Sequence, residues 1–276
     1  MDLYCCPVCG APLRREGGSL KCRERHCFDI AKQGYVNLLT AAGKHARVPG
    51  DNKLMVSARR AFLEKGYYAP MREELCGRVC ALLADCPAPA VLDVGCGEGY
   101  YTERLAAALR ERGHSPAVCG IDISKTALAA AAKKSCGVAY AVASAFHLPV
   151  PDAAFDLVTN LFAPYCGGEF LRVLKPCGLF VMVIPGARHL YELKCAVYDA
   201  PYENEVKDFA LEGFDFLEQR EVAGEILLTS GEDIRNLFCM TPYCYKTSAE
   251  NAARLDALDR LQTTIQFELL FYRKRT

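Results

Sequence analysis

Asp93-Val94-Gly95-Cys96-Gly97-Glu98-Gly99 is the stretch of this 276-residue sequence that decides its fold class. A short apolar segment, 91–94, enters it as a predicted strand, and a helical pattern over 100–112 follows it. The glycines allow a tight turn and a close approach of the backbone to a ligand. Asp122 stands 23 residues after Gly99, at the end of the next predicted strand. A carboxylate in that place suits hydrogen bonds from ribose hydroxyls.

The charge of the loop indicates which nucleoside ligand it takes. A dinucleotide needs a G-x-G-x-x-G loop that holds its pyrophosphate at a helix N-terminus, whereas this loop reads D-x-G-x-G-x-G. Glu98 would repel a pyrophosphate there. An acidic loop instead favours a ligand with a cationic end, such as the methionine ammonium of S-adenosylmethionine. We therefore expect S-adenosylmethionine to be the cofactor.

Strand and helix patterns alternate after this loop, which predicts βαβ units and a parallel sheet. Ser124 is expected to cap a helix that ends near Ser135. A long strand candidate stands at the C-terminus. The predicted strands after the loop are 117–122, 138–143, 155–161, 179–184 and 263–272.

Four potential metal ligands near the N-terminus follow the pattern C-x2-C-x12-C-x3-H. They are Cys6, Cys9, Cys22 and His26. Zinc takes four such ligands at tetrahedral corners, and a site with four protein ligands is structural. Metal binding can stabilise a segment too small to bury a core. Two alternatives stay open: Cys5 could replace Cys6, and Cys27 could replace His26.

Composition bounds the remaining possibilities. The chain is 51% hydrophobic and 24% charged, which is typical of a globular protein. No apolar run reaches the ~18 residues of a membrane span, and the N-terminus lacks the pattern of a signal peptide. We expect a cytoplasmic protein without a membrane partner. Most of its 16 cysteines are then interpreted as buried free thiols.

Charge is unevenly distributed along the chain. Residues 1–80 hold 14 Lys and Arg against 8 Asp and Glu, and the remainder holds 19 against 25. This asymmetry suggests that the first part meets a polyanion, although a solvated basic surface without a partner is the alternative. The candidates for a nucleic-acid clamp on the zinc-binding module are Arg14, Arg15, Lys21, Arg23 and Arg25.

The sequence resembles the class I methyltransferases. Loop 93–99 is similar to their first motif, and Asp122 to their ribose-binding acid. Segment 143–149 resembles their adenine-binding segment, with Ser144 where many members carry Asp. Segment 174–178 resembles the turn before their fifth strand. The resemblance implies an α/β, Rossmann-like fold with a mostly parallel sheet, an antiparallel C-terminal strand and, here, a small N-terminal zinc-binding domain.

Further segments are similar to a narrower family, the bacterial 23S ribosomal RNA (guanine-N1)-methyltransferases, over almost the whole chain. Besides the cysteine pattern, they are 28–39, 49–51, 58–63, 66–68, 91–102, 163–164 and 185–193. This resemblance implies methyl transfer to guanine N1 in a hairpin loop of 23S rRNA, and one branch of the family confers macrolide resistance. It also implies that Tyr68 and His189 touch the cofactor. The expected cofactor-binding residues are Tyr68, Asp93, Gly95, Gly97, Glu98, Gly99, Tyr100, Asp122, Ser144, Ala145 and His189.

The acceptor atom sets the chemistry that this family resemblance requires. Neutral guanine carries a proton on N1, which must leave before or during methyl transfer, and a general base would help. Asn160 and Tyr165 follow the fourth strand, where class I enzymes hold the target base, so Asn160 could read its edge and Tyr165 could stack on it. Packing at a strand end is the alternative for both. His147 and Glu169 are possible bases, and nothing in the sequence selects one.

Three regions are predicted along the chain: a zinc-binding module at 1–39, a linker with helices at 40–85, and a methyltransferase domain at 86–276. The linker, 40–50, carries Lys44, His45 and Arg47, and Asp51 is the expected N-cap of a helix reaching residue 65. A second helix is predicted at 70–83. Methylation of a small molecule and non-catalytic RNA binding are the competing functions. Homodimer formation stays open.

Overall fold

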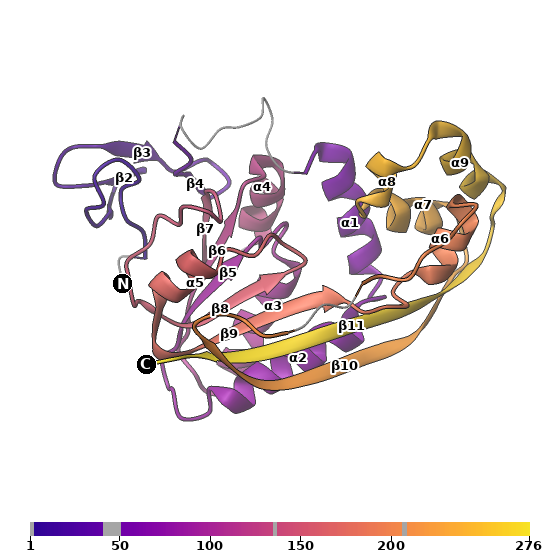
Figure 1. Cartoon of the computed structure of the whole chain (residues 1–276). Coiled ribbons are helices and arrows are strands. Elements are labelled where there is room, and N and C mark those ends of the chain that lie inside the picture. Colours follow the sequence, from indigo (N-terminus) through magenta and orange to yellow (C-terminus); the bar gives the residue numbers. More distant parts are fainter. Residues whose placement is uncertain (1–2, 41–50, 135–136, 206–208) are drawn as a thin grey trace.

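The computed structural model describes residues 3–40, 51–134, 137–205 and 209–276. Its main body is a mixed sheet, eight-stranded within these ranges, in the order β10-β11-β9-β8-β5-β6-β7-β4 (Figure 1). A separate three-stranded sheet, β1-β2-β3, forms the N-terminal module. The strands are β1 (Arg14–Glu16), β2 (Ser19–Lys21), β3 (Cys27–Asp29), β4 (Val36–Asn37), β5 (Ala90–Val94), β6 (Ala117–Asp122), β7 (Val138–Val142), β8 (Phe155–Leu161), β9 (Leu174–Pro185), β10 (Phe214–Leu228) and β11 (Leu261–Lys274).

Helices cover the sheet and extend beyond its C-terminal strands. They are α1 (Lys53–Glu64), α2 (Ala69–Leu82), α3 (Tyr100–Glu111), α4 (Lys125–Lys134), α5 (Gly167–Val173), α6 (Tyr191–Val197), α7 (Gly231–Cys239), α8 (Tyr243–Lys246), α9 (Ala249–Ala253) and the 3-10 helix η2 (Arg254–Ala257). None of them, among the residues described, has both the length and the apolar character needed to cross a bilayer.

The predicted fold class is confirmed. Strands β4 to β9 pair in parallel, and β11 runs antiparallel to β9. A second antiparallel strand, β10, was not predicted and pairs with β11 along almost its whole length. Most β10 side chains are exposed, and among the described strands β10 is the last of the sheet. It therefore lacks the buried apolar pattern that reveals the central strands.

Successive side chains of each strand point to opposite faces of the sheet and pack into two hydrophobic cores, one on each face. Val91 packs in the core shared with α1, α2 and α3, whereas the next residue, Leu92, packs in the core on the opposite face. That second core also contains Phe170 of α5 and Tyr4 of the N-terminal module. Burial on both faces explains why β5 is apolar at every position except Asp93.

The start of α1 differs by one residue from the prediction. Asn52, not Asp51, caps the helix: its side-chain oxygen accepts a hydrogen bond from the Met55 amide at 2.9 Å. The Asp51 carboxylate instead accepts a hydrogen bond from Arg59. The expected N-cap at Asp51 was therefore wrong, because a tertiary ion pair engages that side chain.

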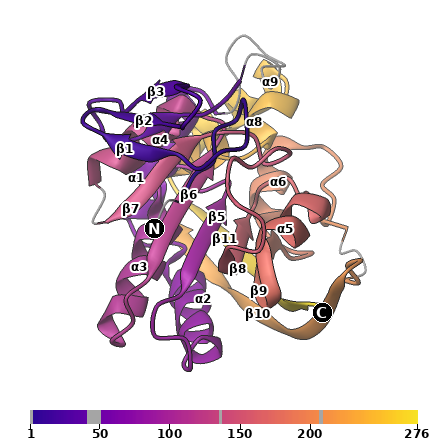
Figure 2. The same cartoon turned by 90° about the vertical axis from the view of Figure 1, so that its left-hand side faces the viewer.

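The N-terminal module is joined to the main sheet by backbone hydrogen bonds. Its last strand, β4, extends the sheet by pairing with β7, and the Cys5 amide donates to the Pro149 carbonyl at 2.8 Å. Figures 1 and 2 show the module beside the β7 edge. The proposed division at residue 39 thus falls just after a strand of the main sheet. Linker residues 41–50, with Lys44, His45 and Arg47, and the expected helix end at Ser135 lie outside the described residues.

Candidate functional site

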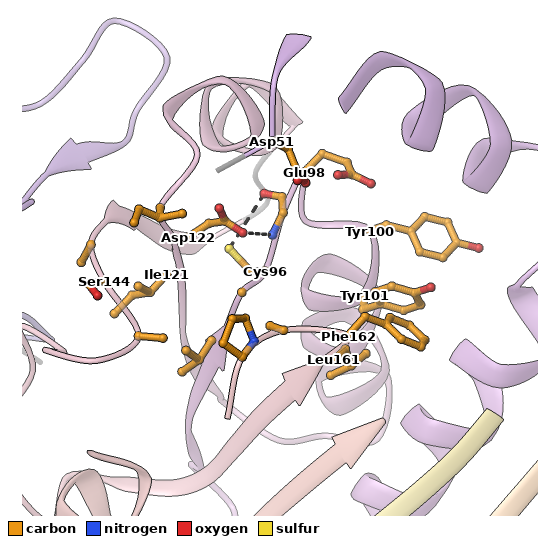
Figure 3. A pocket seen from close by; sticks show the side chains of 18 of the residues that line it. Asp51, Cys96, Glu98, Tyr100, Tyr101, Ile121, Asp122, Ser144, Leu161 and Phe162 are labelled. Carbon is orange, nitrogen blue, oxygen red and sulfur yellow. Dashed lines mark hydrogen bonds between the residues drawn. The ribbon is translucent and has the colours of Figure 1, made fainter. Parts of the chain in front are cut away.

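A cavity of about 350 Å³ opens at the carboxyl ends of β5, β6 and β8. This is the edge of an open α/β sheet where ligands are usually bound. Its walls come from loop 94–98, residues 121–123, segment 143–146 and segment 161–164, with Tyr100 and Tyr101 of α3 and with Asp51 and Arg59. Figure 3 shows Ser144 and Ile121 toward one end and Tyr101 and Phe162 toward the other. Asp122 and the glycine loop lie between these ends.

The loop glycines have left-handed backbone geometry and pack closely against neighbouring residues. Gly95, Gly97 and Gly99 have φ angles of 84°, 54° and 80°. A Cβ on Gly95 would lie 2.3 Å from the Ala163 Cβ, and one on Gly99 would lie 2.5 Å from the Tyr140 hydroxyl. Side chains here would meet both strain and collision, so the sequence pattern of glycines is a requirement of this backbone.

Asp122 faces the cavity with a carboxylate that is partly engaged. Oδ2 accepts from the Gly97 amide at 2.9 Å (Figure 3). Oδ1 accepts from the Ser124 amide at 2.7 Å. Burial raises the pKa of this carboxyl, and the two amides oppose the rise. A carboxylate offers about four acceptor positions, so about two remain for the hydroxyls of a ribose. The site therefore fits the nucleoside part of S-adenosylmethionine, because the Asp122 carboxylate has unused acceptor positions beside the glycine loop.

Asp93 is buried behind the loop and does not line the cavity. Its carboxylate accepts hydrogen bonds from the Thr102 and Thr159 hydroxyls at 2.5 Å and 2.8 Å. Burial raises the pKa of this carboxyl to about 6, although the two hydroxyls lower it. Asp93 therefore ties the loop to α3 and β8, and its predicted contact with the cofactor stays a prediction.

Glu98 is not the free anion that the sequence argument assumed. Its Oε2 accepts from the Arg59 Nε at 2.8 Å, and the Glu98 side chain is 5% exposed. Arg59 also donates to Asp51, from Nη1 to Oδ2 at 2.5 Å. The pairing of Glu98 depends on the packing of α1 against the loop. Sequence reasoning missed this arginine because no local pattern reveals the contact.

Ser144 and Ala145 both line the cavity, as expected for the adenine end. The Ser144 hydroxyl accepts a hydrogen bond from the Phe146 amide at 3.2 Å, which fixes the bend of this segment. Phe146 lines the same wall and is 64% exposed. An exposed aromatic ring beside the cavity suits contact with a planar ligand.

Tyr68 and His189 come together from distant parts of the chain, as a shared role would require, but neither lines the cavity. The Tyr68 hydroxyl and His189 Nε2 are 3.2 Å apart, and both side chains are buried. Both rings pack against Phe267, which contacts Phe162 of the cavity wall. Burial, with a smaller effect of the Lys194 charge, lowers the pKa of His189 to about 3. Their direct contact with the cofactor stays a prediction.

The residues expected to hold the target base do not line the cavity. Asn160 is buried and donates both side-chain hydrogen bonds to backbone carbonyls, those of Val94 and Pro164. Its Oδ1 atom is buried without a partner among the described residues. Tyr165 packs edge-on against Phe170. Neither side chain lines the cavity, so both assignments stay predictions.

Phe162, and not Tyr165, is the aromatic side chain after β8 that lines the cavity. It is 45% exposed and has a φ of 56°, a conformation that bulky side chains rarely adopt. Its ring lies 6.2 Å from that of Tyr101, centroid to centroid. The conformation depends on the turn after β8, so no sequence signal could have shown it.

Neither proposed base lines the cavity. Glu169 accepts hydrogen bonds from the Leu148 amide and from Arg172. Burial raises the pKa of the Glu169 carboxyl, but Arg172 and the Leu148 amide outweigh it and hold the pKa below its ordinary value. His147 is exposed. The carboxyl of Glu169 is thus committed to positioning this segment.

The four predicted metal ligands converge. The ligand atoms of Cys6, Cys9, Cys22 and His26 all lie within 4.8 Å of one another. His26 Nδ1 is 3.5 Å from the Cys6 sulfur and 3.4 Å from that of Cys22, and the Cys9 and Cys22 sulfurs are 3.7 Å apart. Tetrahedral zinc with Zn–S bonds of about 2.3 Å places neighbouring ligand atoms about 3.5–3.8 Å apart, so the group fits zinc. Cys5 and Cys27 are not part of it.

Comparison with known proteins agrees with both sites. Residues 4–47 match the zinc-ribbon family described as RlmA, N-terminal, and residues 91–178 match a methyltransferase domain. A Streptomyces fradiae protein named 23S rRNA (guanine(748)-N(1))-methyltransferase is 39% identical over 189 residues, which cover 68% of this chain and 65% of that protein. The match thus spans just under two thirds of that relative.

Two further relatives are named as putative 23S rRNA (guanine-N(1)-)-methyltransferases. The one from Micromonospora griseorubida is 36% identical over 207 residues, covering 68% of this chain and 67% of the relative. The one from Bacillus subtilis (strain 168) is 29% identical over 275 residues, covering 98% of this chain and 96% of the relative.

A glycine cradle joined to a carboxylate on the adjoining strand, within a matched methyltransferase domain, makes this protein an S-adenosylmethionine-dependent methyltransferase of class I. Its N-terminal cluster is a structural zinc site. With the similarity just described, the chain belongs to the family of 23S rRNA (guanine-N1)-methyltransferases.

Proposed function

We propose that this enzyme transfers a methyl group from S-adenosylmethionine to N1 of a guanine in a hairpin loop of 23S ribosomal RNA. The observation that carries the proposal is the position of the basic zinc module. The Cys5 amide binds the Pro149 carbonyl, a few residues beyond the wall segment 143–146. An RNA held by the module would therefore lie beside the opening of the cofactor cavity.

The cavity walls suggest how the cofactor lies. Adenine would contact Ser144, Ala145 and Phe146, the ribose hydroxyls would donate to Asp122, and the methionine part would follow the glycine loop. When bound, the cofactor supplies an electrophilic methyl group on a sulfonium. This orientation directs that methyl group toward segment 161–164.

Phe162 is the best-placed side chain for the target base. Single-stranded RNA loops are recognised through splayed bases that stack on aromatic rings. The exposed Phe162 ring forms part of the cavity wall, and the Phe267 ring supports it at 5.8 Å, centroid to centroid. Strained backbone at a cavity wall is common where a side chain must be held in one place. Stacking there would align N1 with the methyl group, and such positioning alone lowers the barrier substantially.

Exposed arginines of the zinc module supply the charge that RNA phosphates require. Arg14, Arg15, Arg23 and Arg25 are all exposed. Lys21 is paired with Glu16, and Arg23 with Glu24, through surface ion pairs that phosphate can replace at small cost. We assign RNA binding to this surface and cofactor binding to the main sheet. Cytoplasmic location and dimer formation stay predictions.

The experiment compares two RNA acceptors and one variant. Labelled S-adenosylmethionine is incubated with unmodified 23S or 16S transcripts and with protein in which Arg14, Arg15, Arg23 and Arg25 are replaced by Ala. We expect transfer to 23S RNA in large excess over 16S RNA. The variant should bind RNA less tightly and with a shallower dependence on salt, because fewer counterions are released. Equal transfer to both transcripts would contradict the assignment of the acceptor.

An unchanged salt dependence would contradict the assignment of the clamp. The zinc ligands stay intact in the four-Ala variant, so its fold is checked by zinc content and by its affinity for S-adenosylhomocysteine. That affinity should match the parent, because the cofactor cavity lies in the main sheet.

A further inference from the structure

Arg59 has one nitrogen whose role the fold does not explain. The Nε atom donates to Glu98 and the Nη1 atom donates to Asp51. The Nη2 atom is buried and has no hydrogen-bond partner among the residues described. Buried polar groups of native proteins almost always have a partner, and a guanidinium N–H is an especially costly group to leave without one. The free side of the guanidinium therefore indicates a missing acceptor.

That acceptor belongs to a ligand of the cavity. Arg59 is one of the residues that line it, and its side chain is 21% exposed. Nη2 lies 3.3 Å from the position that a Cβ would take on Gly97, in the middle of the glycine loop. It thus lies against the backbone of a loop residue that also lines the cavity.

The chemistry of the cofactor identifies which group Arg59 meets. S-adenosylmethionine carries one anionic group, the carboxylate of its methionine part. Guanidinium and carboxylate form short, charge-assisted hydrogen bonds. Asp122 provides an acceptor for the ribose hydroxyls, whereas Arg59 of α1 provides a cationic donor beside the glycine loop for the carboxylate. We propose that Arg59 binds the methionine carboxylate of S-adenosylmethionine through Nη2.

Glu98 and Asp51 have a defined part in this arrangement. They hold two edges of the planar guanidinium, so the third edge keeps a fixed direction. Burial alone would lower the pKa of Arg59, but these two carboxylates outweigh that effect and keep the guanidinium charged. Glu98 therefore acts on the cofactor through Arg59, as a positioning residue. The inference concerns the cofactor only and holds whichever acceptor receives the methyl group.

The experiment uses two ligands that differ in the group in question. S-adenosylhomocysteine keeps the amino-acid part, and 5′-methylthioadenosine lacks it. Binding of both is measured by calorimetry to the parent, to Arg59→Lys and to Arg59→Met. Arg60→Met is the matched control, because Arg60 is the next residue of α1, is paired with Glu64 and does not line the cavity.

We expect Arg59→Met to weaken S-adenosylhomocysteine binding by about 10–100-fold, the value of a hydrogen bond to a charged group, with Arg59→Lys intermediate. Binding of 5′-methylthioadenosine should stay within about 3-fold in every variant. Equal losses for both ligands would overturn the proposal, because Arg59 would then hold the ribose or only the loop. Unchanged S-adenosylhomocysteine binding would overturn it as well.

A second measurement needs no variant and covers the case in which Arg59→Met fails to fold. The carboxamide of S-adenosylhomocysteine removes the negative charge from the ligand. On the parent protein it should bind about 10-fold or more weakly than the carboxylate form. In Arg59→Lys, which keeps a cation between Glu98 and Asp51, the same comparison should give a smaller ratio. An undiminished affinity of the carboxamide for the parent would refute the proposal.

Discussion

The buried, neutral state of His189 can be tested by comparing the parent with His189→Asn at two pH values. In the folded protein, His189 Nδ1 accepts from the Gln266 amide at 3.2 Å, which leaves the proton on Nε2 beside the Tyr68 hydroxyl. Protonation of Nδ1 would break the first contact. Asn offers an oxygen in place of Nδ1 and does not titrate.

The sign of the effect follows from the two pKa values of this ring. Burial lowers the folded pKa to about 3, whereas an unfolded histidine titrates near 6.5. Between these values the unfolded chain binds the proton and the folded chain does not, so stability is present above pH ~6.5 and is lost as pH falls. A pH of 5 lies about 1.5 units below the pKa of the histidine ring in the unfolded chain. The loss from this residue is then about 2 kcal/mol.

Urea unfolding of both proteins at pH 7.5 and pH 5.0 measures the loss. The parent should lose about 2 kcal/mol more than His189→Asn between the two conditions. Protonation of other groups, including the zinc ligands and Asp93, affects both proteins alike and cancels in the difference. Equal losses would refute the reasoning, because His189 would then be accessible to solvent. A neutral ring of this kind also provides hydrogen bonds and not general-base catalysis at neutral pH.

Three further predictions concern the metal, the ribose and the target base. Elemental analysis of protein purified without chelator should find about one zinc per chain, lost in Cys9→Ser, and a zinc-free parent would contradict the cluster. Asp122→Ala should weaken S-adenosylmethionine binding by about 1–3 kcal/mol by calorimetry, and unchanged affinity would show that the carboxylate does not hold the ribose. Phe162→Leu should slow single-turnover methylation of RNA by about 10-fold or more, and Tyr165→Leu much less, since base stacking contributes about 1–3 kcal/mol. The opposite ranking would return the stacking role to Tyr165.

Local patterns made the central sheet and the metal site predictable. The strands β5 to β8 are buried on both faces, so their mainly apolar sequences predict their positions to within a residue. The zinc ligands lie close in sequence, and their spacing alone brings four atoms together. The tight turn of the glycine loop was equally predictable, because glycine is the residue that most readily adopts left-handed backbone geometry.

The features that escaped prediction depend on contacts between distant segments. Arg59 reaches Glu98 only because α1 packs near the loop, and this contact also takes Asp51 away from the helix cap. β10 is stabilised by pairing with β11 and not by burial, so its sequence shows no apolar alternation. The direction of Phe162 follows from one left-handed residue after β8. Pattern reasoning could not foresee that Phe162 would line the cavity, and the stacking role predicted for Tyr165 stays a prediction.

We propose that the enzyme transfers its methyl group to N1 of a guanine in 23S RNA. The most direct measurement treats an unmodified 23S transcript with the enzyme and S-adenosylmethionine, digests one part to nucleosides for mass spectrometry, and uses the other part for primer extension. N1-methylguanosine should appear at about one per transcript, with a new stop of reverse transcriptase beside one guanine of a hairpin loop, because N1 lies on the Watson–Crick edge. Methyl groups recovered on another atom or base, or no transfer to the RNA at all, would contradict the account.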